Sequence, residues 1–396
     1  MQSIRPSFLQ IAKMNFSLII TVLVLLQSVC GCALLPAEYK TIENGGPVVL
    51  PRDMYMVPDY QVQWWYYTGH LTSEEGKEFG FELVFFIRRT EQDRVLGIPV
   101  YNYSTPAHMA HFAITDLQSK NFSYSDIHNK DFFTRNGNAG ALRNSLCIWN
   151  GDWSVKEIGN LYYLKASMPQ YDLSLALTPK KPPILHGNQG RFIKAARSDK
   201  QAGTFYITIP RFEAEGTLFV EQKPYKVTGS VWMDREFGTH QLAKDQIGWD
   251  WFGIQLDNGT DLMIYLLKRK DGSYETQTSC ATWIEPDGTS RTIPFSKIKI
   301  EKLKSWTSPR TDTEYTVQWR IKIEPEDLEM TIIAVLNDQE IDSSASTMIK
   351  YWEGKMTVNA MYRGKEIKGK AYLEMCGNAH PITYLSSFPA LKDQKS

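Results

Sequence analysis

Residues 254–266 have the sequence Ile254-Gln255-Leu256-Asp257-Asn258-Gly259-Thr260-Asp261-Leu262-Met263-Ile264-Tyr265-Leu266. Two apolar runs flank the Asn258-Gly259 pair, which predicts a β-hairpin with both central residues of the turn at positive φ. Further turn signals follow at 270–272 and 286–288, and residues 79–88 form another strand-like apolar run. The part of the chain after the N-terminal region shows no long helix-period stretch. The sequence therefore predicts an all-β protein built from antiparallel strands.

A weak internal repeat divides the chain. Trp64-Trp65-Tyr66-Tyr67, followed by His70-Leu71, has the same spacing as Trp249-Asp250-Trp251-Phe252, followed by Gln255-Leu256. Its position near the start of each half indicates a duplication, and 396 residues also suit two domains at about 150 residues per domain. The 11 Trp, 20 Tyr and 18 Phe residues favour strands. Two such halves suit closed or nearly closed barrels, and a barrel of about eight strands can hold one small ligand.

The charge composition excludes several kinds of partner. Lys plus Arg and Asp plus Glu both number 44, and no basic run occurs, so we expect no nucleic-acid partner. The sequence contains no Gly-rich phosphate loop and no G-x-S-x-G motif. We therefore predict no cofactor and no α/β-type serine hydrolase.

The N-terminus has the features of an export signal. Arg5 and Lys13 precede the apolar run 18–26, which is shorter than the roughly 20 residues that a membrane-spanning helix needs. The run ends in Val29-Cys30-Gly31-Cys32, which is similar to a lipobox. We predict a lipoprotein signal peptide over 1–32, a lipid on Cys32, a tether over 33–50, and a place in the cell envelope, anchored to the membrane. The alternative is an ordinary cleaved signal that releases a free protein.

The remaining cysteines, Cys147, Cys280 and Cys376, lie far apart and lack metal-ligand spacing. They allow at most one disulfide and make a structural zinc site implausible. His108 and His111 form an H-x-x-H pair, but their apolar surroundings predict a strand, on which positions three apart face opposite sides. We therefore predict no metal site, and keep His111 as a candidate ligand-binding residue.

The segment 229–240 is the densest unusual stretch, with Asp234, Arg235 and Glu236 placed between apolar residues. On a strand, Trp232 would share a face with both carboxyl groups, and Arg235 would lie on the other face. A buried carboxyl among aromatic side chains has a raised pKa and can act as an acid. The alternative is a structural ion-pair network in which Arg235 neutralises a carboxylate. A third interpretation takes Asp234 and Glu236 as the carboxylates of a glycoside hydrolase.

This segment, together with Gly248–Phe252, resembles the signature of the AttH and CrtC group, which includes carotenoid 1,2-hydratases. Further matches extend over most of the chain after the N-terminal region. They are Trp64-Trp65-Tyr66 with Gly69-His70-Leu71, Lys181–Gly187, Trp306-Thr307-Ser308-Pro309-Arg310 and Tyr351-Trp352-Glu353-Gly354. The resemblance implies two lipocalin-like (calycin-type) antiparallel β-barrels in tandem. We place them at 51–230 and 231–385.

The resemblance also implies a chemistry, the acid-catalysed addition of water to an alkene. Asp234 would protonate the double bond, and aromatic faces such as those of Trp232, Tyr66 and Trp251 would shelter the carbocation. Two departures from the family's pattern stand out. The stretch 205–209 lacks the histidine of the hydratases, and Gln63 stands where relatives often carry Glu.

Two functions follow as hypotheses. One is a hydratase-like envelope enzyme acting on an apolar isoprenoid, lipid or polyketide-like molecule, with Asp234, Trp232, Glu236 and Arg235 as candidate catalytic residues. The other is a non-catalytic carrier or envelope-assembly lipoprotein for a hydrophobic ligand. In both, the candidate ligand-binding residues are those of the repeat and one histidine: Trp64, Trp65, Tyr66, His111, Trp249 and Trp251.

Overall fold

The computed structural model describes residues 39–89, 94–95, 98–99, 106–129, 137–195, 202–239 and 241–382. The predicted signal peptide, Cys32 and residues 33–38 lie outside these ranges. Nearly all regular structure in these ranges is antiparallel strand, and the helical segments described are the single 3-10 turns η1 (Arg52–Met54), η3 (Phe295–Lys297) and η4 (Glu324–Glu326). None of the described helices is long and apolar enough to cross a membrane.

The strands form two large sheets. The first has the spatial order β6 (Asn121–Asn129), β5 (Ala107–Asp116), β2 (Glu78–Arg88), β1 (Val62–Ser73), β15 (Lys223–Gly238), β14 (Ala202–Val220), β11 (Tyr171–Pro179), β10 (Leu161–Met168), β9 (Trp153–Ile158), β8 (Cys147–Asn150) and β7 (Ala139–Ala141). The short strands β12 (Ile184–Leu185) and β13 (Arg191–Ala195) pair with β14. β3 (Arg94–Val95) and β4 (Ile98–Pro99) form a separate small pair.

The second sheet has the order β19 (Ser290–Pro294), β18 (Cys280–Ile284), β17 (Asp261–Arg269), β16 (Gln246–Leu256), β25 (Lys365–Cys376), β24 (Ile349–Tyr362), β22 (Leu328–Ala334), β21 (Glu314–Ile323) and β20 (Ile298–Thr307). β23 (Glu340–Ser343) pairs with β24. The chain passes from the first sheet to the second between Gly238 and Gln246.

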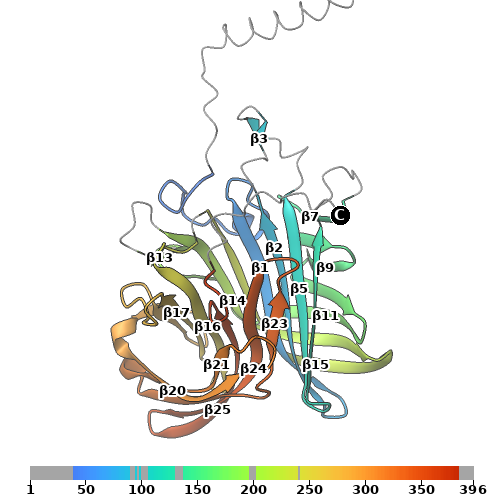
Figure 1. Ribbon diagram of the computed structural model, residues 1–396. Coiled ribbons are helices and arrows are strands. Elements are labelled where there is room, and N and C mark those ends of the chain that lie inside the picture. Colours follow the sequence, from blue (N-terminus) through green and yellow to red (C-terminus); the bar gives the residue numbers. More distant parts are fainter. Residues whose placement is uncertain are drawn as a thin grey trace, which may run out of the picture.

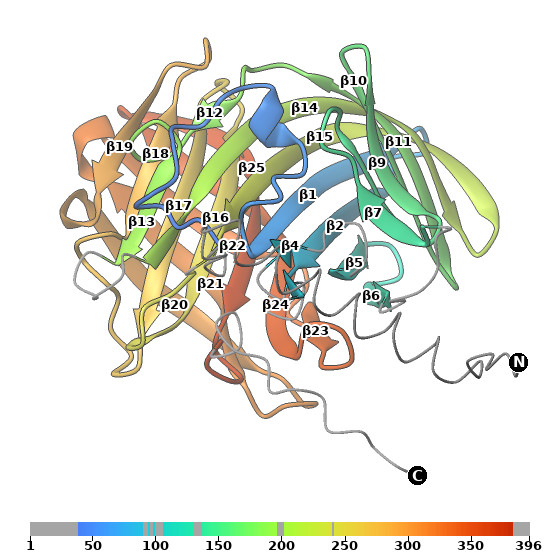
Figure 2. The ribbon, with the colours of Figure 1, turned by 90° about the horizontal axis from the view of Figure 1, so that it is seen from above.

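Both sheets curl strongly, as Figures 1 and 2 show. The first closes almost into a barrel, because β6 comes into contact with β8 across the open edge. The second forms an open half-barrel. The two curled sheets contact each other through β2 and β24, β1 and β25, and β14 with β16 and β17. This architecture confirms the predicted all-β class with two tandem barrel units.

The internal repeat has the same place in both units. β1 carries the first copy and pairs with β15, the last strand of the first sheet. β16 carries the second copy and pairs with β25, the last strand of the second sheet. In each unit the repeat therefore lies on the strand that joins the beginning of the sheet to its end.

The hairpin at 254–266 is formed by β16 and β17, with Gln255 opposite Asp261. Only Gly259 has a positive φ, of 86°, so the prediction for Asn258 was wrong. The connection holds the four residues 257–260, and the Asn258 side-chain oxygen accepts a hydrogen bond from the Thr260 N–H at 3.0 Å. Asn258 thus begins a side-chain-stabilised turn, which does not require the left-handed conformation.

The two units are held together by a buried ion pair. The ammonium of Lys181, which follows β11, lies 2.7 Å from an Asp261 carboxylate oxygen on β17. It also donates to the backbone carbonyls of Gly259 and Glu285 at 2.6 and 2.8 Å. Since all these acceptors belong to the second unit, Lys181 fixes one barrel against the other.

Candidate active site

A pocket lies between the two sheets and encloses about 640 Å³ of empty space, its opening included. Its walls come from both units and consist mainly of aromatic side chains with a few carboxyl groups. The lining residues are Trp64, Tyr66, Val84, Phe86, His111, Tyr206, Asp234, Glu236, Trp249, Trp251, Tyr265, Thr347, Ile349, Tyr351, Glu374 and Cys376.

β15 presents its alternating side chains to two different environments. Asp234 and Glu236 line the pocket, and Trp232 packs in the same aromatic cluster between the units. Met233 and Phe237 point the other way, into the core of the first barrel. This is the alternation that the sequence predicts for a strand.

Arg235 lies on the barrel side and does not reach the pocket. Its guanidinium stacks on Trp65 at 4.0 Å and donates to the Gln63 amide oxygen at 2.9 Å. It also donates to the backbone carbonyls of Tyr55 and Glu236, both at 2.8 Å. Its partners are therefore neutral oxygens rather than the carboxyl groups beside it in the sequence, because those project from the opposite face of the strand.

Asp234 is almost fully buried and receives three hydrogen bonds. The Tyr206 hydroxyl donates to Oδ2 at 2.5 Å, while Thr208 Oγ1 and Trp232 Nε1 donate to Oδ1 at 2.5 and 2.8 Å. Burial raises the pKa of Asp234 to about 7, an effect that the three donors oppose and the nearby Glu236 reinforces. A carboxyl that titrates near neutral pH can both give and take a proton in this pocket.

Glu236, two residues further along the same face, has a cation as its partner. Its Oε2 lies 2.8 Å from the ammonium of Lys194 and accepts a hydrogen bond from Thr204. The same ammonium lies 4.8 Å from the ring centroid of Tyr265 and 5.5 Å from that of Trp64. Two carboxyl groups on one strand face thus have different surroundings, since Asp234 accepts from neutral donors and Glu236 is paired with a cation.

The opposite wall of the pocket carries acids that the sequence analysis did not single out. Glu374 lines the pocket and accepts from Trp249 Nε1 at 2.9 Å. Glu353 is the cross-strand neighbour of Glu374 on β24 and accepts a hydrogen bond from the Tyr66 hydroxyl, and Glu82 on β2 interacts with both through its charge. Burial raises the pKa of all three carboxyl groups, and their mutual repulsion raises those of Glu82 and Glu353 further. Glu353 lies in the Tyr351–Gly354 motif, and this motif was the sequence signal from which Glu353 could have been identified.

Both copies of the repeat contribute to the pocket. Tyr66 and Trp251 meet edge to face with ring centroids 5.3 Å apart, and Trp64 and Trp249 also line the wall. Trp251 Nε1 donates to the Tyr206 hydroxyl at 2.8 Å and so connects the second unit to Asp234. Trp65 is not brought to the pocket, because it points into the first barrel and donates to the Met54 carbonyl at 2.8 Å.

His111 lines the pocket from β5, whereas His108 does not. The ring of His111 contacts the Tyr351 hydroxyl at 2.6 Å and Ser346 Oγ at 3.2 Å, both from the second unit. Burial lowers the pKa of His111 to about 4, so the ring is neutral near pH 7. Cys147, Cys280 and Cys376 are free thiols in the structure.

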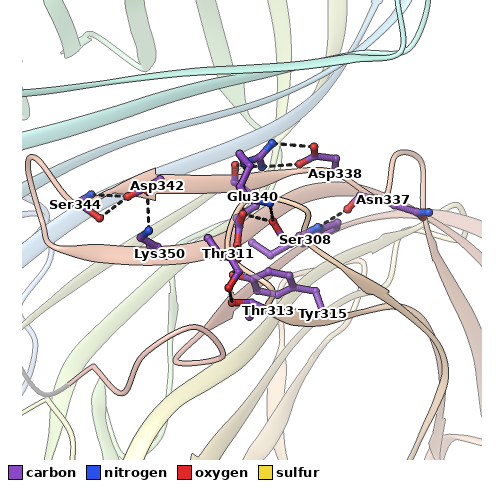
Figure 3. Close-up of polar contacts among 12 residues, drawn as sticks. Ser308, Thr311, Thr313, Tyr315, Asn337, Asp338, Glu340, Asp342, Ser344 and Lys350 are labelled. Carbon is purple, nitrogen blue, oxygen red and sulfur yellow. Dashed lines mark hydrogen bonds and ion pairs between the residues drawn. The ribbon is translucent and has the colours of Figure 1, made fainter.

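The hairpin of β23 and β24 brings Thr347, Ile349 and Tyr351 to the pocket. Its first residue, Glu340, is fully buried and accepts hydrogen bonds from Ser308 at 2.5 Å, Thr311 at 2.6 Å and Tyr315 at 2.9 Å (Figure 3). Arg310 completes this network, because its Nε lies 3.5 Å from Glu340 Oε2 and its Nη2 pairs with Asp338 at 2.6 Å. The Trp306–Arg310 motif therefore anchors the base of a hairpin that forms part of the pocket wall.

Comparison with known proteins agrees with this architecture. A family model described as AttH-like matches residues 41–378. A Nitrosomonas europaea structure assigned to AttH superposes with a TM-score of 0.75 and 26% identity, over 85% of this chain and 98% of the other. Kievitone hydratase from Nectria haematococca gives a TM-score of 0.64 at 12% identity, over 87% and 98%.

CghA in complex with Sch210972 gives a TM-score of 0.52 at 12% identity, over 87% of this chain and 97% of CghA. No curated protein matches the chain. The likenesses at 12% identity show a shared fold.

Proposed function

The chain belongs to the AttH-like family, and on that premise we propose that it is an exported enzyme that adds water to a carbon–carbon double bond of an apolar molecule. The observation that carries the proposal is Asp234, a carboxyl with a pKa of about 7 on the wall of an aromatic pocket. Kievitone hydratase has the same fold, so this fold accommodates hydration in at least one protein.

The proposed reaction proceeds in two steps. Asp234 transfers its proton to one alkene carbon, and the π electrons form the new C–H bond, which leaves a carbocation on the other carbon. Water adds to that carbon, and the Asp234 carboxylate takes the surplus proton, so the acid is regenerated. The faces of Tyr66 and Trp251, which line the pocket, would stabilise the cation through their π systems.

The apolar character of the substrate follows from the lining. Aromatic and aliphatic side chains make up most of the pocket wall, and Lys194, the cation beside it, is paired with Glu236. An isoprenoid or a lipid-like molecule with an isolated double bond fits such a site better than a sugar does.

The test is replacement of Asp234 by Asn, which keeps the shape and removes the acid. Incubation of the full chain with isoprenoid alkenes in heavy-oxygen water should give a hydrated product carrying the label. In Asp234→Asn we expect the rate to fall by about 10²- to 10⁴-fold. Asp172→Asn, on the exposed side of β11, serves as the matched control and should be fully active. Full activity of Asp234→Asn would refute the assignment.

A second candidate function is that of a carrier for an apolar ligand. The lining of the pocket favours it, because a largely aromatic wall also suits storage of an unchanged apolar ligand. Native mass spectrometry of the purified chain should then show a co-purified apolar molecule that is recovered unaltered. Recovery of a hydrated derivative would support the enzyme instead.

We also propose that the protein is held at a membrane by a lipid on Cys32. The described chain begins at the same end of the strands that carries Trp64, Glu236 and Trp249, so a short tether would keep the pocket near the bilayer (Figure 1). Labelling cells with a clickable fatty acid tests the anchor. Equal labelling of the wild type and Cys32→Ala would remove it.

A further inference from the structure

A buried chain of hydrogen bonds runs from the second unit to Asp234. The Thr282 hydroxyl on β18 lies 2.8 Å from His186 Nδ1, and His186 Nε2 lies 2.6 Å from the Thr208 hydroxyl on β14. Thr208 in turn donates to Asp234 Oδ1 at 2.5 Å. His186 and Thr208 are fully buried, and His186 does not line the pocket.

The directions of these hydrogen bonds follow from counting hydrogens. A threonine hydroxyl has one hydrogen, and that of Thr208 points to Asp234, so Thr208 must accept from His186 Nε2–H. Nδ1 is then the bare nitrogen of a neutral ring, and it accepts the hydrogen of Thr282. Burial lowers the pKa of His186 to about 3, which keeps the ring neutral and in this role at neutral pH.

This series of hydrogen bonds makes the two oxygens of Asp234 different. Oδ1 accepts from both Thr208 and Trp232, and an indole N–H can only donate. Oδ2 faces the hydroxyl of Tyr206, which can donate to a carboxylate or accept from a carboxylic acid. A proton on the carboxyl therefore has a matching partner at Oδ2, whereas at Oδ1 it would compete with two donors.

We propose that His186 is a positioning residue for Asp234: through Thr208 it keeps a donor on Oδ1, so that Oδ2 carries the acid proton. The role as acid rests on the proposed function, but the ionisation of Asp234 can be measured without any substrate. The arrangement also makes the acid depend on both units, because Thr282 belongs to the second sheet.

Other ionisable groups surround Asp234, and the variants used in the test must leave these groups and their contacts unchanged. They are Tyr206 on β14, Tyr265 on β17, and Glu236 with its partner Lys194. The His186 ring also packs on Tyr206, with centroids 4.3 Å apart. His186→Phe is therefore the suitable variant, because it keeps an aromatic ring at this contact and removes both nitrogens.

The experiment is a carboxyl NMR titration of Asp234 in the full chain, with its signal assigned by loss in Asp234→Asn. Removal of a donor disfavours the carboxylate, so Thr208→Val should raise the Asp234 pKa by about one pH unit. His186→Phe should raise it by part of that amount, and Thr208→Ser should leave it near the wild-type value.

The decisive measurement is the double variant. If His186 acts through Thr208, then His186→Phe adds no further shift in the Thr208→Val background. An equal shift in both backgrounds, or no shift in either, would overturn the proposal. Should His186→Phe fail to fold, His186→Met supplies the same test, since it also removes both ring nitrogens and its side chain can fill much of the space of the ring. An unchanged Asp234 pKa in a folded His186→Met protein would then count against the proposed role of His186.

Loss of hydration activity is not needed for this test. If the chain proves to be a carrier, the titration still decides whether His186 sets the ionisation of Asp234. If hydration is shown but the His186 variants titrate as the wild type does, only the positioning role fails.

Discussion

The interior of the first barrel and the pocket between the units are both buried and aromatic, but their polar groups differ. Inside the barrel, the Arg235 guanidinium stacks on the ring of Trp65 and donates a hydrogen bond to the neutral amide oxygen of Gln63. Between the units, Asp234 and Glu374 line the pocket and accept hydrogen bonds from aromatic side chains. The barrel interior is thus packed as a core, and the candidate site lies where the two copies of a repeated unit meet.

The largest expected effect separates the two faces of β1. Trp65 is fully buried in the barrel, so Trp65→Ala should lower the free energy of unfolding by about 3–5 kcal/mol. Its neighbour Trp64 lines the pocket and is only partly buried, so Trp64→Ala should cost about 1 kcal/mol and weaken ligand binding instead. Urea unfolding and titration with N-phenylnaphthylamine measure the two effects.

The comparison fails if the two tryptophans exchange roles. Loss of dye binding in a folded Trp65→Ala protein, with normal binding in Trp64→Ala, would place the ligand inside the first barrel. Leu142→Ala, at an exposed position, is a control that should change neither quantity.

Buried carboxyl groups between the two units should bind protons in the folded state. The pKa of Glu82 is raised well above its ordinary value by burial and by the charge of Glu374, and both of its oxygens lack a hydrogen-bond partner among the described residues. The folded state therefore binds this proton more tightly than the unfolded state does. The contribution of this proton to the free energy of unfolding is fully present below the unfolded pKa of about 4.3. It is lost as the pH rises toward the folded pKa, by up to about 1.4 kcal/mol per pH unit for each such group.

Denaturant unfolding from pH 5 to pH 8 should show this decline, and Glu82→Gln should make it less steep because the amide cannot ionise. Asp172→Asn, which changes an exposed carboxyl, should keep the wild-type slope. Identical slopes for Glu82→Gln and the wild type would show that Glu82 is not protonated in the folded protein.

The sequence predicted one side of the pocket better than the other. Alternation along β15 placed Asp234 and Glu236 on one face, because strand periodicity is local information. Glu353 meets Tyr66 across 287 positions of the chain, and no local pattern reports such a contact. His186 was equally hidden, since its partner Thr282 comes from the other unit. What the sequence missed is therefore the set of contacts made when the two units dock.

We expect the smallest effect from a change at Ser308, which tests whether the anchor of the β23–β24 hairpin keeps the pocket wall in position. Ser308→Ala removes the 2.5 Å hydrogen bond to the buried Glu340 and the one that the Arg310 N–H donates at 3.2 Å (Figure 3). Because Thr311 and Tyr315 still bind Glu340, we expect a loss of only about 1 kcal/mol in the free energy of unfolding.

Glu340 begins the hairpin that supplies Thr347 and Tyr351, so Ser308→Ala should also weaken dye binding severalfold. Ser344→Ala is the matched control, because Ser344 is exposed on the same hairpin and bonds only to Asp342 among the described residues. If both serine variants bind the dye as the wild type does, the hairpin's anchor is independent of the pocket. The position of the hairpin would then be held by the other contacts of Glu340, from Thr311, Tyr315 and Arg310, rather than by Ser308.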